Sequence, residues 1–167
     1  RAADVLIYGT GFKAAEFLAP MTVSGLDGRT LADAWRDGAQ AYLGITVSGF
    51  PNFFMLYGPN TNLGGNSIIY MLEGQIGYAL RAIQALRAGA WIDVRPEVQD
   101  AFNSWVQKAS RASVWESGCH SWYTTPSGSN TNNWPGQTFM YRYRVRRFDP
   151  AAYRAGQLAP TAPENSI

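Results

Sequence analysis

The pattern of hydrophobic and polar positions predicts two long amphipathic helices. In residues 67–88 the apolar side chains recur at intervals of three and four, which is the spacing of one helix face. They are Ile68, Ile69, Leu72, Ile76, Ala79, Leu80, Ile83 and Leu86. Asn66 or Ser67 can cap the start of this helix. A similar stripe in residues 96–112 predicts a second helix, with Pro96 in its first turn.

Short apolar runs predict β-strands before and after these helices. The predicted strands span residues 4–8, 41–47, 53–57 and 138–148. A short helix is expected over residues 30–36, where Thr30 is suited to cap the helix and Asp33 completes a capping box. The sequence therefore predicts a mixed α+β structure with two main helices.

The chain is predicted to form one domain followed by a tail. Residues 1–150 hold all the predicted elements and include a loop, residues 117–136, that is rich in Ser, Thr, Asn, Pro and Gly. Residues 151–167 lack a periodic pattern and are predicted to be the tail. The chain begins without a Met and enters a predicted strand at once, so we expect it to be a piece of a longer protein.

The composition is that of a globular protein. Hydrophobic residues make up 46% of the 167 residues and charged residues 16%, which argues against disorder. A net charge of +2 is too small to indicate binding to nucleic acid or to an acidic membrane. The sequence shows no signal peptide or long apolar segment, and its single cysteine fits a reducing compartment, so we expect a cytoplasmic protein.

Isolated reactive side chains give weak indications of chemistry. Cys119 and His120 are the single cysteine and the single histidine, and adjacent residues rarely face each other as nucleophile and base. Their number and spacing argue against a zinc site. Glu73 lies in the first predicted helix, where we expect it to pair with a basic residue. Arginines alternate at Arg142, Arg144, Arg146 and Arg147. They are expected to form the solvated face of a strand, with a phosphate site as the alternative.

The segment Gly9-Thr10-Gly11-Phe12-Lys13-Ala14 follows a predicted strand and fits the pattern G-x-G-x-x-A of dinucleotide-binding turns. Pro20 leaves room for roughly half of the crossover helix that such a unit requires. A turn at the end of a strand, where glycines allow positive φ, explains the same residues. The pattern alone leaves both interpretations open.

A second segment carries more information. It runs Gly49-Phe50-Pro51-Asn52-Phe53-Phe54-Met55-Leu56-Tyr57-Gly58-Pro59-Asn60-Thr61-Asn62 and leads through Leu63-Gly64-Gly65-Asn66 into the first long helix. Here an apolar strand is followed by a polar loop and then by the start of a helix. The unpaired backbone N–H groups of the helix start therefore point toward a ligand bound beyond the end of the strand. This segment resembles the last flavin-binding segment of Baeyer–Villiger-type flavoprotein monooxygenases. Within that family it most resembles the branch that includes 4-hydroxyacetophenone monooxygenase.

The start of the chain shares the resemblance. Residues 4–12 are similar to the motif Asp-…-Ala-Thr-Gly-Phe, with which the family chain returns from its NADP domain to its FAD domain. Gly9 stands here in the place of the alanine. The resemblance implies that cofactor-binding residues lie in both motifs, at Thr10, Gly11, Pro59 and Asn60.

The resemblance also assigns a role to the start of the first long helix. Backbone N–H groups at Asn66, Ser67 and Ile68 are implied to approach the pyrimidine edge of the flavin, where a helix N-terminus stabilises negative charge. The fold class implied is α/β, with the chain forming the C-terminal part of a Rossmann-like FAD-binding domain.

A third motif is Ser121-Trp122-Tyr123 followed by Trp134-Pro135-Gly136, which resembles the family segment Ser-Trp-Tyr…Pro-Gly-Lys. In the family this tryptophan lies beside NADP, which implies cofactor binding by Trp122. Gln137 stands where the family has lysine, and the spacer is longer. The alternative for Trp122 is packing at the edge of the core.

The resemblance implies an enzyme that uses FAD and NADPH to insert one oxygen atom of O2 into a small-molecule ketone or onto a heteroatom. The family's catalytic arginine has no match in this chain, so no catalytic residue and no metal ligand are assigned. We expect the fragment to be inactive without the N-terminal part of the same protein. Two alternatives remain, an N-hydroxylating or other flavin monooxygenase of the same fold, and a non-catalytic fragment that associates with itself as a homodimer.

Overall fold

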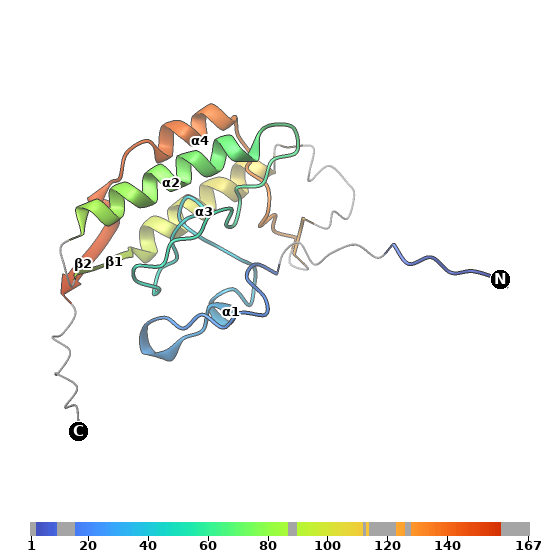
Figure 1. Cartoon of the computed structure of the whole chain (residues 1–167), viewed down its shortest axis with the longest axis horizontal. Coiled ribbons are helices and arrows are strands. Elements are labelled where there is room, and N and C mark those ends of the chain that lie inside the picture. The colour runs from blue at the N-terminus through green and yellow to red at the C-terminus, as the bar shows by residue number, and fades with distance from the viewer. Residues whose placement is uncertain are drawn as a thin grey trace, which may run out of the picture.

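The structure is a computed structural model that describes residues 3–9, 16–86, 90–111, 113, 123–125 and 128–157. Its elements are η1 (Leu26–Gly28), α1 (Leu31–Ala34), α2 (Ile68–Ala85), β1 (Ala90–Val94), α3 (Pro96–Ser110), α4 (Thr138–Val145), η3 (Pro150–Ala152) and β2 (Tyr153–Gln157). Figure 1 shows α2, α3 and α4 running alongside one another, with β1 and β2 at one end. A loop-rich part that carries α1 lies below them in that view.

The two long predicted helices are confirmed. Ser67 caps α2 through its Oγ, which accepts a hydrogen bond from the N–H of Tyr70 at 3.3 Å. Pro96 occupies the first turn of α3, and Glu97 lies beside the positive end of that helix. The short helix is confirmed as α1, because Thr30 caps it and accepts a bond from the N–H of Asp33.

A two-stranded antiparallel sheet joins the middle of the chain to residues beyond the predicted end of the domain. β1 pairs with β2 in a register that places Ala90 opposite Gln157 and Val94 opposite Tyr153. The pair is held by a buried charge, because the fully buried Asp93 carboxylate accepts a 2.6 Å bond from Arg154. The same carboxylate accepts a bond from the N–H of Gly49 at 2.9 Å. Residues 153–157 are therefore part of the folded unit.

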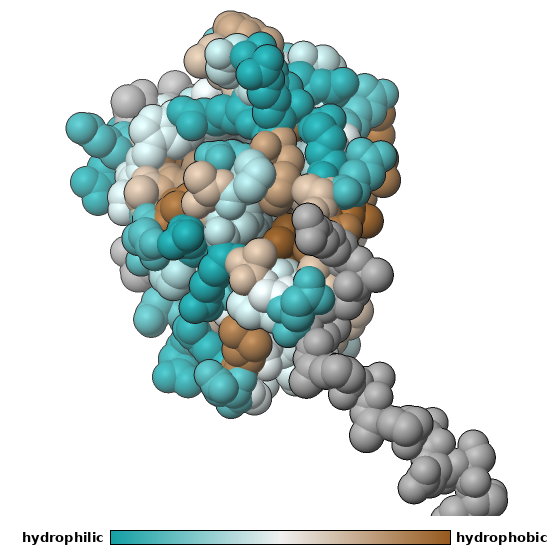
Figure 2. Space-filling view, turned by 90° about the vertical axis from the view of Figure 1, so that its left-hand side faces the viewer, coloured by the Kyte–Doolittle hydropathy of each residue, from teal (hydrophilic) through white to brown (hydrophobic). Residues whose placement is uncertain are grey.

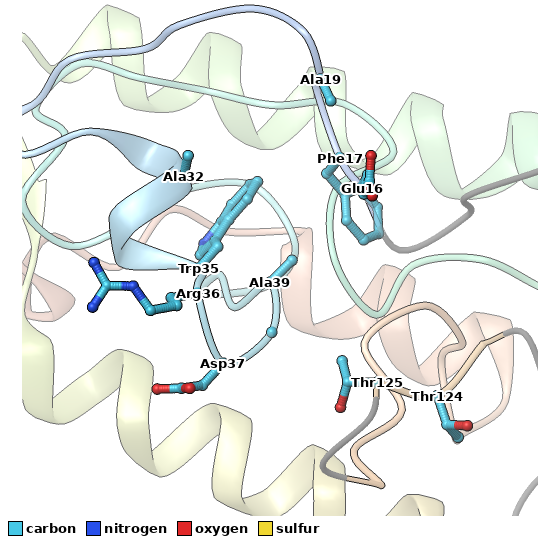
Figure 3. A pocket seen from close by; sticks show the side chains of 11 residues that line it. Glu16, Phe17, Ala19, Ala32, Trp35, Arg36, Asp37, Ala39, Thr124 and Thr125 are labelled. Atoms are coloured by element: carbon cyan, nitrogen blue, oxygen red, sulfur yellow. The ribbon is translucent and has the colours of Figure 1, made fainter.

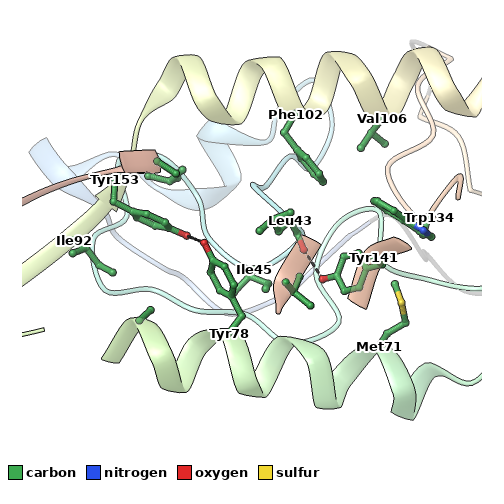
Figure 4. Close-up of a cluster of buried hydrophobic side chains, with 14 residues drawn as sticks. Leu43, Ile45, Met71, Tyr78, Ile92, Phe102, Val106, Trp134, Tyr141 and Tyr153 are labelled. Carbon is green, nitrogen blue, oxygen red and sulfur yellow. Dashed lines mark hydrogen bonds between the residues drawn. The ribbon is translucent and has the colours of Figure 1, made fainter. Parts of the chain in front are cut away.

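The main core lies between α2 and α3 (Figure 4). Its buried members include Leu43, Ile45, Met71, Tyr78, Val94, Phe102, Val106, Trp134, Tyr141, Val145 and Tyr153. Polar atoms inside it are paired, since the Tyr78 and Tyr153 hydroxyls lie 3.0 Å apart and Thr46 Oγ1 lies 3.1 Å from the Tyr153 hydroxyl. Burial raises the pKa of Tyr153 to about 12 and raises the pKa of Tyr78 as well.

A second, smaller core holds the loop-rich part together. It contains Leu31, Ala41, Val47, Phe50 and Met55. Leu31 comes from α1, Ala41, Val47 and Met55 come from segments on which strands were predicted, and Phe50 lies between those segments. This part therefore folds around apolar side chains without a regular sheet among the described residues.

All four strand predictions are wrong, and three of them concern segments that fold in another way. Residues 138–145 form α4, because Tyr141 and Val145 lie one turn apart and both bury against α2. Residues 41–47 form a tight turn, in which Leu43 and Gly44 have positive φ and Tyr42 pairs with Thr46. Residues 53–57 are irregular chain.

The first predicted strand has no sheet to join among the described residues. The side chains of residues 5–8 are 70–90% exposed, and the segment extends away from the body of the molecule (Figure 1). The prediction of a buried strand is therefore wrong for this structure. The residues have the composition of a buried strand but lack neighbouring strands that could pair with them.

Candidate functional site

The site is built around the loop of residues 58–66, which enters α2. Two glycines, Gly44 and Gly58, allow the backbone of this loop to pass close to the turn at residues 43–44. A Cβ atom on Gly44 would overlap Thr61, and one on Gly58 would overlap the carbonyl of Gly44. Gly44 also has a φ of +66°, which side chains disfavour. The Thr61 hydroxyl donates to the Gly58 carbonyl at 2.7 Å and tightens the turn.

Asn60 holds this loop to a distant part of the chain. Its side chain is 2% exposed and donates to the carbonyls of Asn130 at 2.7 Å and Asn133 at 3.3 Å. Its backbone N–H donates to the carbonyl of Thr131 at 2.9 Å. Pro59 beside it is fully buried. Both residues thus lie inside the protein, where they fix the position of the loop.

Asn62 extends the same junction as a short parallel bridge. Its N–H donates to Asn132, its carbonyl accepts from the N–H of Trp134, and its side-chain amide donates to the Asn133 side chain at 2.9 Å. The Tyr57 hydroxyl donates to the Asn62 side chain at 2.6 Å. The loop is therefore held from both sides, so its shape is set before any ligand binds.

The start of α2 is exposed and keeps unpaired donors. Ser67 is the cap, and the N–H of Ser67 already donates to the Asn66 side chain at 2.7 Å. The Asn66 amide donates in turn to Thr138 at 3.1 Å. Among the described residues, the N–H groups of Ile68 and Ile69 have no acceptor. They are the free donors at this end of the helix.

The charge at this helix start is positive. The first turn of α2 contains no acidic residue, so the partial positive charge of the helix end is not neutralised there. Glu73 lies one turn further on and pairs with Arg142 at 3.4 Å, with both side chains exposed. This confirms the predicted ion pair and leaves Glu73 without a catalytic arrangement. The site can therefore accept a carbonyl or carboxylate oxygen.

A buried relay connects the loop to the helices behind it. The Gln75 side chain is fully buried in α2 and accepts from the N–H of Tyr57 at 2.8 Å. Its amide donates to the Tyr141 hydroxyl at 2.9 Å. That hydroxyl donates to the Leu43 carbonyl at 2.6 Å (Figure 4). Burial raises the pKa of Tyr141, so this hydroxyl keeps its proton.

A separate cavity of about 620 Å³ opens beside α1 (Figure 3). Phe17 and Trp35 meet edge to face in its wall, with ring centres 6.1 Å apart. Arg36 lies at the rim, and Thr124 and Thr125 lie across from Trp35. Its apolar wall and few polar groups suit a flat ring system with polar substituents.

Three of the predicted cofactor-binding residues, Thr10, Gly11 and Trp122, lie outside the described residues, as do Cys119 and His120. Pro59 and Asn60 lie buried in the loop before α2, whereas Asn66, Ser67 and Ile68 lie at the start of that helix. The four arginines expected on a strand lie on α4 or just after it, where Arg142, Arg144 and Arg146 stack on aromatic rings.

Gln75 and the segment 130–134 were not predicted from the sequence to have a role in the site. Gln75 could have been recognised as a polar residue on the apolar face of the predicted helix, because a buried amide needs hydrogen-bond partners. The run Asn130-Thr131-Asn132-Asn133 was placed in a loop, although such residues often bond backbone groups. The described residues hold no group of three or more His, Cys, Asp or Glu side chains arranged for a metal ion. Within the same residues, every helix is too short or too polar to cross a bilayer.

The chain is similar to several curated proteins over most of its length. It is 45% identical over 157 residues to a Baeyer–Villiger monooxygenase of Pseudomonas aeruginosa, which covers 92% of this chain and 30% of that protein. It is 42% identical to a Baeyer–Villiger monooxygenase of Streptomyces coelicolor, with 95% of this chain and 31% of that protein covered. An FAD-binding monooxygenase of Aspergillus niger, ktnD, is 46% identical over 85% of this chain. The chain spans about 30% of the length of the first two relatives.

Solved structures agree with these relatives. An oxidized steroid monooxygenase bound to NADP superposes with a TM-score of 0.69 at 29% identity, covering 82% of this chain and 26% of that one. OTEMO in complex with FAD and NADP superposes with a TM-score of 0.74 at 25% identity, covering 92% of this chain and 30% of that one. No protein-family model matches the chain. The α/β fold class predicted from the sequence is confirmed by these superpositions.

Proposed function

We propose that this chain, which corresponds to a C-terminal portion of the Baeyer–Villiger-type flavoprotein monooxygenases, forms the flavin-facing end of an FAD- and NADPH-dependent monooxygenase. The complete enzyme inserts one oxygen atom of O2 into a small ketone or adds it to a heteroatom. The observation that carries the proposal is the fixed loop at residues 58–66, which ends at a helix start with free N–H donors. N-hydroxylation by an enzyme of the same fold is the alternative chemistry.

The residues present fit a flavin. Ile68 and Ile69 offer N–H donors at an uncompensated helix N-terminus, and a Cβ on Gly65 would meet no neighbouring atom. Such a place accepts a flat ring whose carbonyl oxygen carries negative charge. FAD, when bound, supplies the redox chemistry with O2, and the protein positions it. The role of this chain is to orient the ring and to hold charge at its edge.

Pro59 and Asn60 take a positioning role in this proposal. Their side chains are buried, and the Asn60 amide is occupied by two backbone carbonyls. They therefore act on the cofactor by fixing the loop. Thr10 and Gly11 are proposed to approach the cofactor at the family's return motif, and Trp122 to lie beside NADPH. No catalytic side chain is assigned to this chain.

The proposal is tested with a chimera that carries this chain in place of the matching 157 residues of the Pseudomonas aeruginosa relative. We expect it to bind FAD, to consume O2 with NADPH, and to convert cyclohexanone to a lactone or thioanisole to its sulfoxide. The two products separate ketone insertion from heteroatom oxidation. A folded chimera that binds no flavin would contradict the proposal. A flavin-loaded chimera that oxidises an amine but neither probe would favour N-hydroxylation.

The backbone role of Ile68 has its own test in the chimera. Ile68→Pro removes one N–H at the first helical position, where proline fits. Ser67 before it has an extended backbone, φ −74° and ψ 116°, as a residue before proline requires. We expect a more negative flavin reduction potential, because a donor to the negatively charged ring edge is lost. Ile68→Val keeps the N–H and serves as the control. An equal shift in both variants would show that the side chain matters instead.

A further inference from the structure

A cavity of about 310 Å³, apart from the cavity beside α1, is lined by residues of α2, α3 and α4. Leu43, Tyr78 and Phe102 form its buried wall, and Tyr78 and Phe102 point into the space between α2 and α3 (Figure 4). Three arginines at the end of α4 and just after it also line the cavity. They are Arg144, Arg146 and Arg147. The cavity thus joins a wall that suits a flat ring to a rim that suits a negative charge.

Aromatic rings hold two of the rim guanidinium groups in place. The Arg144 Cζ lies 4.2 Å from the centre of the Trp105 ring, and the Arg146 Cζ lies 3.8 Å from the centre of the Tyr143 ring. A ring stacked on the face of a guanidinium leaves its in-plane N–H groups free to donate. In the described part of the chain, none of the three rim arginines forms an ion pair. Their charge is therefore open to an external anion.

Tyr42 adds a neutral donor to the cavity. Its ring packs edge to face on Phe102 and Tyr153, with ring centres 5.6 Å and 6.2 Å apart. Among the described residues, its hydroxyl has no hydrogen-bond partner. Burial, followed by the nearby charge of Asp149, raises the pKa of Tyr42, so this hydroxyl keeps its proton and can donate.

The charge around the cavity is positive on balance. Asp149 supplies the one carboxylate among the described lining residues, and it already accepts a bond from the N–H of Ala151 at 3.0 Å. One negative charge therefore faces three positive ones. A carboxylate is a good match for a guanidinium, because two oxygens can accept from two N–H groups of the same fork.

An ordinary solvated face is the competing interpretation of the arginines. Charges on a solvated helix are usually of both signs, but the sequence Thr138–Val145 contains no acidic residue. Figure 2 faces the end of the molecule at which α2 and α4 finish, and it shows hydrophilic side chains around paler and brown ones. Inorganic phosphate would satisfy the rim and leave the aromatic wall in water. A ring that carries a carboxylate satisfies both.

We propose that this cavity binds a small aromatic carboxylate, whose ring lies against the wall formed by Tyr78 and Phe102 and whose charge is held by the rim arginines. The volume is at the lower end of the range for ligand pockets, which favours one or two rings. Tyr78 lies about 15 Å along α2 from Ile68, so the cavity is separate from the helix start assigned to the flavin. The proposal does not rest on the proposed function.

Isothermal titration calorimetry of the chain with benzoate tests the site, at a fixed and low ionic strength because salt screens exposed charges. We expect one benzoate to bind per chain, with a dissociation constant of about 1 mM or below. Acetate lacks the ring and benzamide lacks the charge, so both should bind at least about tenfold more weakly. Equal binding of the three compounds would overturn the proposal.

Arg146→Gln removes a rim charge and is expected to weaken benzoate binding by at least about fivefold. Arg142→Gln is the matched control, because Arg142 also lies on α4 and stacks on a ring, that of Tyr70, but does not line the cavity. Its effect should stay below about twofold. Circular dichroism checks that both variants fold. Equal losses would show that the net charge of the chain attracts the anion, and would overturn the proposal.

A photoreactive analogue locates the site without any substitution. The chain is irradiated with 4-azidobenzoate, and the labelled peptides are identified by mass spectrometry. We expect label on peptides that contain Tyr42, Phe102 or Tyr143, and less label when excess benzoate is present. Label confined to other peptides, no detectable binding of benzoate, or inorganic phosphate that binds as tightly as benzoate would each overturn the proposal. Flavin binding by the chimera is measured separately, so the two proposals can fail independently.

Discussion

Gln75 is the residue at which the loop, α2 and α4 are connected. Its side chain accepts from the N–H of Tyr57 and donates to the hydroxyl of Tyr141, and all of it is buried. A buried group that loses its partner costs more than the average hydrogen bond contributes. The geometry of the loop beside the helix start therefore depends on a residue that does not reach the site.

Gln75→Leu is expected to lower the free energy of unfolding by about 1–3 kcal/mol, because the buried Tyr141 hydroxyl loses its donor and the N–H of Tyr57 loses its acceptor. Urea unfolding followed by circular dichroism measures this change. Gln84→Leu, at an exposed position of the same helix, should change the stability by no more than about 0.5 kcal/mol. Equal effects of the two substitutions would show that the relay is energetically unimportant.

Tyr153 makes the stability of the chain sensitive to alkali. Burial is the main cause that raises its pKa to about 12 in the folded protein, whereas a tyrosine in the unfolded chain titrates near 10. Below pH 10 both states are neutral and its contribution is complete. As the pH rises from 10 to 12 the unfolded state ionises first, so stability falls, most steeply near pH 11 at about 1 kcal/mol for each pH unit.

Urea unfolding at pH 9, 10, 11 and 12 measures this loss. Tyr153→Phe removes the ionising group, so the slope of stability against pH above 10 should become shallower than in the unsubstituted chain. The variant is also less stable at pH 9, since the hydroxyl bonds to Thr46 and Tyr78 are lost. An unchanged slope would mean that Tyr153 is accessible to hydroxide in the folded state.

At the scale of elements, α2 and α4 approach closely at one glycine. A Cβ on Gly74 would lie 2.9 Å from Val145 and 3.2 Å from Arg142, both on α4. A Cβ on Gly77, one turn later, would meet only the flexible end of Arg81, at 3.3 Å. The two glycines lie on the same helix, but only Gly74 contacts α4. Substitutions at Gly77 can therefore serve as the control for substitutions at Gly74.

Gly74→Ala is expected to destabilise the chain by about 1–3 kcal/mol, because the two helices must separate. Gly77→Ala is expected to stabilise it by up to about 1 kcal/mol through helix propensity. Thermal unfolding of both variants measures the difference. A gain in stability from Gly74→Ala would show that α4 can shift away from α2 without loss.

The elements that the sequence predicted correctly are those whose periodicity extends over several turns. α2 and α3 repeat their pattern over 15 or more residues, and Ser67 and Pro96 mark their starts. α4 was mistaken for a strand because Thr138–Val145 alternates aromatic residues with arginines, while its helical contacts depend only on Tyr141 and Val145. In eight residues, the two periodicities fit almost equally well.

The helix start in the candidate site was predicted from its local signals, whereas the residues that hold the preceding loop in place were not predicted. Asn66, Ser67 and Ile68 are adjacent in sequence, so the cap and the loop mark them. The partners of Asn60 lie 70 and 73 residues away, and no local pattern identifies them. The turn at Leu43 and Gly44 was missed because apolar residues on both sides of it resemble a strand.

At the scale of the whole molecule, the isolated chain is expected to be colourless and inactive. The chain contains the loop that we propose to face the flavin, but it has no match to the family's adenosine-phosphate loop, which supplies much of the affinity for FAD. An absorption spectrum of the purified chain with added FAD after gel filtration measures retention. Stoichiometric flavin absorbance, or NADPH-dependent O2 uptake by the chain alone, would contradict this prediction.

The long-range hydrogen bonds of Asn60 also determine the order in which the loop and α2 can form during synthesis. Synthesis adds about 5–20 residues per second, so the carbonyls of Asn130 and Asn133 are made roughly 4–15 s after Asn60. A helix such as α2 forms within microseconds once its residues are available. The start of α2 can thus form seconds before the preceding loop makes its hydrogen bonds to residues 130–133. A ligand held by both can be captured only at the last stage of folding.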